Sequence, residues 1–131
     1  MAQVFALVTC DTAVLSRGMW TLVNAFDELF FDEFPAVHPG FDVMVGLKDL
    51  RGVGATDIDL ELVDFRMELD DAANAVVWYD MVEIAAAPPL RREWIRFRTK
   101  DVRFPHPGIY EIRVLENGEI IETGAIRVRQ S

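Results

Sequence analysis

Apolar and polar residues alternate along the last third of the chain. The alternation covers residues 95–98, 110–114 and 126–129, where arginines or a glutamate separate Ile, Phe, Tyr and Val. Successive side chains of a strand point to opposite faces, so each segment predicts a β-strand with one buried and one solvated face. Asn117-Gly118 follows the second segment and tolerates the positive φ of a two-residue type I′ turn. The sequence therefore predicts a hairpin at this point.

The middle of the chain alternates too, with one change of phase. Residues 41–48 place apolar side chains at odd positions, which predicts a half-buried strand. Residues 57–62 place them at even positions, whereas residues 63–70 return to odd positions. A slip of one residue between Leu62 and Val63 turns the side chains that follow to the other face. We therefore expect a β-bulge there, or a strand that changes sheets.

Residues 19–34 are the ambiguous part of the chain. Their apolar positions fit a strand, but Leu22, Val23 and Phe26 also have helical spacing. We favour a strand, and a helix stays open. Residues 4–9 and 76–84 are apolar runs typical of strands. The pattern as a whole predicts an all-β fold, a two-sheet antiparallel sandwich of the immunoglobulin-like kind with about seven to eight strands, forming a single domain over residues 1–131.

Two resemblances agree with this fold. Pro107-Gly108-Ile109-Tyr110, followed by the hairpin, resembles the tyrosine corner of immunoglobulin-like and fibronectin-like domains, in which a Tyr hydroxyl bonds to nearby backbone. The segments 6–11, 34–39 and 107–110 (Ala-Leu-Val-Thr-Cys-Asp, Phe-Pro-Ala-Val-His-Pro and Pro-Gly-Ile-Tyr) resemble an uncharacterised family of small bacterial β-sandwich proteins. This second resemblance supports the fold and implies no activity.

Composition and charge exclude several classes of function. The chain has 131 residues, a net charge of −9 and one cysteine. This charge argues against binding to nucleic acid or an anionic membrane, so we expect neither partner. No apolar run reaches the length of about 18 residues that a membrane helix needs. The apolar run that ends at Cys10 lacks the basic segment of a lipoprotein signal, so we expect a plain strand and a cytoplasmic protein.

The charges are spread unevenly along the chain. Residues 1–89 hold 4 basic and 16 acidic side chains, whereas residues 90–131 hold 9 basic and 6 acidic ones. We expect acidic and basic strands to lie side by side and to pair across the sheets. An alternative is that two oppositely charged regions bind another copy of the chain or a partner.

Both histidines precede Pro-Gly. His38-Pro39-Gly40 and His106-Pro107-Gly108 are expected to be turns that lead into strands, with Pro setting φ and Gly supplying a permissive position. The alternative is a small metal-binding protein or metal-dependent enzyme, in which both imidazoles bind a divalent ion together with Asp32 or Asp42.

The sequence predicts no catalytic residues and no cofactor. Cys10 has the context of a small buried apolar residue, and Ser16 and Ser131 lack that of a nucleophile. The many carboxylates are expected to form a solvated face, and Gly52-Val53-Gly54 has neither the lysine nor the helix of a phosphate loop.

Aromatic residues exceed what one small core needs. The neighbours Phe30-Phe31 and Trp78-Tyr79 must place one ring on each face of a strand. The outward ring of each pair is either covered by a loop or buried against a protein partner or a second copy, as in a homodimer, because aromatic residues are favoured interface anchors. The candidate interface residues are Phe30, Phe31, Trp78, Tyr79 and Trp94. A carbohydrate- or peptide-binding sandwich is a further alternative and requires a groove lined by two or more aromatic rings. The sequence thus favours a non-enzymatic protein-binding or assembly module.

Overall fold

The chain forms β-strands throughout the part that the structure describes. The computed structural model describes residues 2–50, 55–66, 74–85 and 91–131, which contain eleven strands and no α-helix. The strands are β1 (Gln3–Ser16), β2 (Met19–Phe26), β3 (Glu28–Phe31), β4 (Ala36–His38), β5 (Asp42–Lys48), β6 (Ala55–Asp64), β7 (Val76–Ala85), β8 (Glu93–Arg98), β9 (Val102–Phe104), β10 (Gly108–Glu116) and β11 (Glu119–Gln130). Over these residues no helix is long and apolar enough to cross a membrane.

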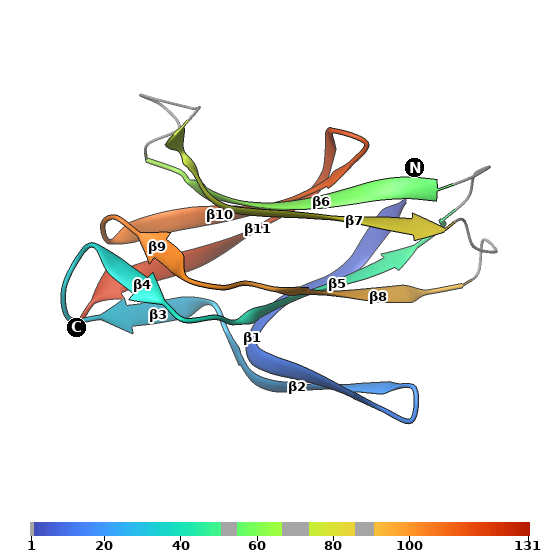
Figure 1. Ribbon diagram of the computed structural model, residues 1–131, viewed down its shortest axis with the longest axis horizontal. Coiled ribbons are helices and arrows are strands. Elements are labelled where there is room, and N and C mark those ends of the chain that lie inside the picture. Colours follow the sequence, from blue (N-terminus) through green and yellow to red (C-terminus); the bar gives the residue numbers. More distant parts are fainter. Residues whose placement is uncertain (1, 51–54, 67–73, 86–90) are drawn as a thin grey trace.

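Two main sheets face each other (Figure 1). One has the strand order β2-β1-β5-β8, the other has the order β3-β11-β10-β6-β7, and β4 and β9 form a two-stranded ribbon. All neighbours are antiparallel except β3 and β11, which run parallel. The predicted all-β, immunoglobulin-like sandwich is confirmed. The described residues hold more strands than the seven to eight expected because β3, β4 and β9 are short segments of four, three and three residues.

The core lies between the sheets and consists of the apolar positions of the alternating segments. Val43, Val45 and Leu47 of β5 are fully buried, as are Ile58, Leu60 and Leu62 of β6. The inward side chains of β8, β10 and β11 complete the same cluster. The periodicity of the sequence therefore identifies the buried face of these strands correctly.

Several local predictions are confirmed. Of residues 19–34, 19–26 and 28–31 form β2 and β3, which decides for strand over helix, and residues 32–34 are bends that follow β3. The pairing of β6 with β7 shifts register between Leu62 and Val63, where the phase of the pattern changes. Asn117 and Gly118 both have positive φ, 48° and 88°, and join β10 to β11. Phe65 follows β6 in an exposed turn, and residues 67–70 of the predicted second half lie outside the described residues.

The prediction of a half-buried strand at residues 41–48 is wrong. Every residue from Phe41 to Leu47 is buried, on both faces of the sheet. Asp42 and Met44, at the polar positions of the pattern, are covered by the hairpin that β1 and β2 form. Gly46 lies under the ring of Phe5, where an added Cβ would come within 2.6 Å of a ring carbon. A strand can thus alternate in sequence and still be covered on both sides by its own chain.

The tyrosine corner is present at the base of the β10–β11 hairpin. The fully buried Tyr110 donates a hydrogen bond from its hydroxyl to the backbone carbonyl of His106, at 2.6 Å. Burial raises the pKa of Tyr110 to about 12, so the hydroxyl is protonated and can donate at neutral pH.

Acidic and basic strands pair across the sheets in two places. Arg98 of β8 reaches Asp42 of β5, and Arg129 of β11 reaches Glu28 of β3. These contacts support the expected cross-strand pairing.

Candidate interaction surface

The β1–β2 hairpin projects from the sandwich as an arm (Figure 1). Residues Gln3–Cys10 of β1 pair with β5, and residues Thr9–Ser16 pair with β2. Because β5 begins only at Asp42, opposite Cys10, the second half of β1 continues with β2 as its one neighbour among the described strands. A turn at Arg17 and Gly18, with φ of 52° and 75°, reverses the chain. We call residues 11–26 the arm.

A buried carboxylate fastens the arm to the sandwich. The fully buried Asp42 accepts a hydrogen bond from the backbone N–H of Ala13 at 2.7 Å and one from the Arg98 guanidinium at 3.1 Å. Arg98 also donates to the carbonyl of Asp11, and Arg96 donates to that of Ala13. These side chains satisfy the backbone groups of β1 beyond the end of β5, where no strand is available to do so.

A small second core lies beneath the arm. Cys10, Ala13 and Met44 are buried there, and Trp20 and Leu22 pack against them. Burial, and then the negative charge of Asp42, raises the pKa of the Cys10 thiol. Cys10 is therefore the small buried apolar residue that the sequence predicts, with no thiolate character.

Several apolar side chains of the arm are open to solvent. Val14, Leu15, Met19 and Val23 are 49%, 55%, 68% and 38% exposed. A groove of about 450 Å³ lies between the arm and β8, lined by Gly18, Met19, Trp20, Leu22 and Trp94. Exposed apolar side chains beside a groove are a common feature of interaction sites.

The five aromatic residues predicted at an interface lie in different places. Phe30 and Tyr79 are half-exposed on β3 and β7, the opposite edge strands of the five-stranded sheet. Their neighbours Phe31 and Trp78 pack against the core, so each pair does place one ring on each face. Trp94 lies on the other sheet, edge-on to the ring of Phe5. Only Trp94 borders the groove beside the arm.

The two histidines contact different groups. Nδ1 of His38 accepts a hydrogen bond from the N–H of Gly40, and its ring packs edge-on against Phe31 and Phe41. Burial lowers the pKa of His38 and thereby favours the neutral ring that this bond needs. Nε2 of His106 lies 2.7 Å from the buried carboxylate of Asp64.

These contacts give the metal hypothesis no support. Asp42 holds the arm, Asp32 is exposed, and the described residues contain no group of three or more His, Cys, Asp or Glu side chains that suits a metal ion. Both His-Pro-Gly segments lead into a strand, as predicted, but only His106 and Pro107 form a bend; His38 is the last residue of β4, and Pro39 and Gly40 connect it to β5. The two glycines serve different purposes. Gly108 has a φ of 153°, whereas Gly40 leaves room for the carbonyl of Thr99, 2.7 Å from where a Cβ would lie.

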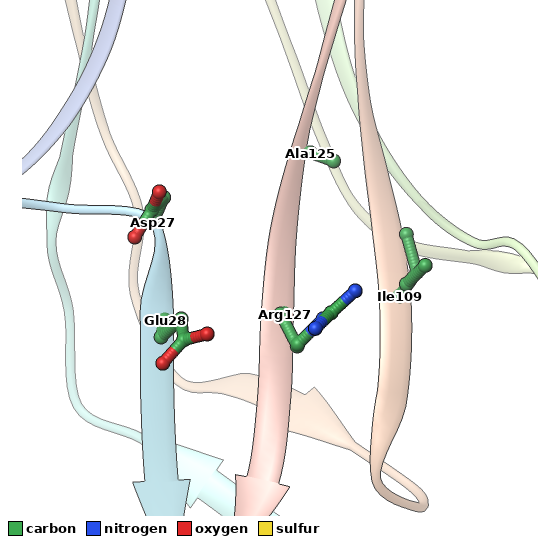
Figure 2. A pocket seen from close by; sticks show the side chains of 5 residues that line it. All are labelled: Asp27, Glu28, Ile109, Ala125 and Arg127. Atoms are coloured by element: carbon green, nitrogen blue, oxygen red, sulfur yellow. The ribbon is translucent and has the colours of Figure 1, made fainter.

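A shallow pocket of about 310 Å³ lies on the outer face of the five-stranded sheet (Figure 2). Asp27 and Glu28 line one side and Ile109 the other. Figure 2 shows the Arg127 side chain directed across β11 towards Ile109 and away from both carboxylates. Glu28 is bound by Arg129, but the Asp27 side chain has no ion-pair partner among the described residues.

Sequence reasoning missed the aliphatic residues of the arm. It singled out aromatic rings, whereas Val14, Leu15, Met19 and Val23 supply most of the exposed apolar surface. A signal is present in the sequence, because residues 18–26 hold no charged side chain in a chain that is 27% charged. Charged side chains deter pairing at an exposed edge strand. A strand without them is typical of a position buried on both faces or of an edge that pairs with a partner.

The comparisons with known proteins identify the family and the fold. Residues 5–129 match the model of a family of unknown function, DUF6941, and the chain belongs to this family. No curated protein matches the sequence.

Two solved structures that share the fold come from larger proteins. An alkylpurine DNA glycosylase of Pseudomonas fluorescens, AlkC, solved with DNA, matches 98% of this chain with a TM-score of 0.55 and 12% identity. A β-glucosidase of Listeria innocua matches 98% with a TM-score of 0.52 and 14% identity. This chain spans 30% and 16% of their lengths. An immunoglobulin-like protein of Pseudomonas aeruginosa aligns over 98% of this chain and 97% of its own, with 11% identity and a TM-score of 0.42. At such identities the first two likenesses concern the fold alone.

Proposed function

We propose that this domain is a non-enzymatic protein-binding module and that the arm is its docking element. The observation that carries the proposal is the projection of an uncharged strand, β2, at the open edge of a sheet, with apolar side chains exposed along the hairpin. An open edge offers backbone donors and acceptors to a partner strand, and alternate side chains then select its sequence.

The groove beside the arm adds a place for an apolar side chain of the partner. Trp20 of the arm and Trp94 of β8 line the groove. It therefore has the two aromatic rings that a carbohydrate- or peptide-binding groove requires. Its other side chains, those of Met19 and Leu22, are apolar. A sugar needs several hydrogen-bonding side chains beside the stacking rings, so this lining favours a peptide.

Peptide selection tests the proposal. We expect linear peptides selected from a random library against the protein to have alternating apolar residues. Their amide and side-chain contacts should map to the arm in NMR titrations. Trp94→Ala and Val23→Lys should weaken binding about tenfold each, since each removes an anchor or blocks the edge.

Ile120→Lys is the matched control, because Ile120 is a 53% exposed aliphatic residue next to the turn of the other hairpin. It should leave peptide binding unchanged. Failure to select any peptide, or selected peptides that bind equally to the arm variants, would refute the proposal.

A further inference from the structure

Four described strands lie at the edges of the two sheets, and β2 is the one with no charged residue. β3 has only four residues. β8 carries Arg96 and Arg98, and charged residues deter edge pairing. On β7 the backbone N–H of Met81 donates a hydrogen bond to the carboxylate of Asp80. This N–H is therefore not free to donate to a strand added at the edge. β2 has eight residues with no charge, no proline and no glycine. No described strand pairs with its outer edge.

Charges of opposite sign flank β2. Arg17 precedes the strand, and Asp27 and Glu28 follow it. Neither Arg17 nor Asp27 has an ion-pair partner in the part of the chain that the structure describes, and Figure 2 shows Arg127 directed away from Asp27. Two antiparallel copies of β2 would bring Arg17 of each copy beside Asp27 of the other. A parallel arrangement would place like charges together, which disfavours it.

The two faces of β2 fix the register of such a pair. Residues directly opposite each other in an antiparallel pair must lie on the same face, so the two residue numbers must have an even sum. A pair centred on Leu22 meets this condition. It places Thr21 opposite Val23 of the second copy and brings Arg17, in the turn before β2, towards Asp27, which follows the strand. Met19 and Val23 of the two copies then lie on the same face, with Thr21 between them.

We propose that the partner of the arm is a second copy of this chain, joined through antiparallel pairing of β2 with β2 about a two-fold axis at Leu22. The inference rests on the proposed function and adds the identity of the partner. The four-stranded sheets of the two copies become one continuous sheet. The contact uses the same surface on both copies, so the assembly closes at a dimer.

Charge exchange at the two ends of β2 tests the pairing. Sedimentation velocity over a range of concentrations should show wild-type protein at twice the chain mass of 14.9 kDa. Arg17→Glu and Asp27→Lys should each raise the dimer dissociation constant about tenfold, because each creates two like-charge contacts in a symmetric dimer. The double variant Arg17→Glu/Asp27→Lys restores both contacts and should return to the wild-type value. Arg103→Glu on β9, an exposed arginine far from β2 in the sheet order, is the control and should have no effect.

Cysteine cross-linking tests the register separately. Cys10 is buried and is the only native cysteine, so an introduced thiol on the exposed face of the arm has no native competitor. A mixture of Thr21→Cys and Val23→Cys proteins should form a disulfide-linked heterodimer under mild oxidation. Either variant alone should cross-link much less, because its thiols would be two residues out of register.

The outcomes separate this inference from the proposed function. A wild-type protein that stays monomeric, or a double charge variant that fails to recover, overturns the dimer. If the arm still binds selected peptides in that case, the arm docks a different protein and the proposed function stands. If the protein neither dimerises nor binds selected peptides through the arm, both the dimer and the proposed function are wrong.

Discussion

The two hairpins of this protein have turns of the same kind but differ in their neighbouring strands. Arg17-Gly18 joins β1 to β2, and Asn117-Gly118 joins β10 to β11, each with two successive residues at positive φ. The β10–β11 hairpin is flanked on both sides, by β6 and by β3. In the arm no described strand lies beyond β2, and four apolar side chains are exposed. A turn thus determines how a chain reverses, and the neighbouring strands determine what the hairpin is free to contact.

The bases of the hairpins are held by different kinds of group. The β10–β11 hairpin is paired along its length, with one register shift between Val114 and Leu115, and has the hydroxyl of Tyr110 at its base. The arm leaves its ladder with β5 at Cys10, and side chains take over, above all the carboxylate of Asp42. An element held by side chains can project from the fold without leaving buried backbone groups unsatisfied.

Removal of the Asp42 carboxylate should have the largest effect on stability. We expect Asp42→Ala to lower the free energy of unfolding by about 3 kcal/mol, because the buried N–H of Ala13 and the Arg98 guanidinium lose their acceptor. Asp42→Asn keeps an acceptor for Ala13 and should cost about half as much. Urea unfolding measures both. Glu119→Ala, an exposed residue at the other turn, is the control. A loss under about 1 kcal/mol for Asp42→Ala would show that the arm is held mainly by its apolar contacts.

Removal of the corner hydroxyl should cost less. Tyr110→Phe keeps the buried ring and deletes the bond to the His106 carbonyl, so we expect a loss of about 1.5 kcal/mol. The pH dependence provides a second measurement. Burial raises the pKa of Tyr110 from 10.0 to about 12 in the folded protein, so wild-type stability should fall as the pH rises from 10 towards 12. The Phe variant should lose this alkaline decline. An identical decline in both proteins would assign it to other groups.

Substitution of alanine for each turn glycine should lower the free energy of unfolding by different amounts in the two hairpins. Gly18 and Gly118 have φ of 75° and 88°, and no atom lies within 4 Å of an added Cβ at either, so the penalty comes from the backbone alone. We expect Gly118→Ala to cost about 1 kcal/mol. Gly18→Ala should cost less than half of that, because the tip of the arm can open locally without unfolding the sandwich. Equal losses in urea unfolding would mean that the arm folds as one unit with the sheets.

The sequence predicts the hairpins and the core better than it predicts the surface. Alternation identifies the inward residues of β6, β10 and β11, and Asn117-Gly118 identifies its turn, because both signals are local. The covering of Met44 depends on Ala13, Trp20 and Leu22 of the arm, which are more than twenty residues away in the chain. Alternation of apolar and polar residues carries no information about that contact, so it predicts that β5 is half-buried.

The candidate site was predicted only in part, for a similar reason. Trp94 was identified, but Phe31 and Trp78 pack inward, and the aliphatic residues of the arm were missed. Exposure of Met19 and Val23 follows from the position of β2 at the end of the strand order. Strand order is a property of the whole fold, and an apolar residue has the same identity in a core and on an open edge.

Lysines on the open edge should change association and leave folding almost untouched. Met19 and Val23 are 68% and 38% exposed on β2, so Met19→Lys/Val23→Lys removes few buried contacts and should stay within about 1 kcal/mol of wild type. Lysine on an edge strand deters pairing, and a two-fold contact would bring four of them together, so the variant should be monomeric where wild type is a dimer. Ile120→Lys makes the same kind of change at the tip of the β10–β11 hairpin, where Ile120 is 53% exposed, and should keep the wild-type association. Unfolding is measured at a concentration below the dissociation constant, so that only folding is compared. If Ile120→Lys abolished association and the arm variant did not, the docking element would be the tip of the β10–β11 hairpin and not the arm.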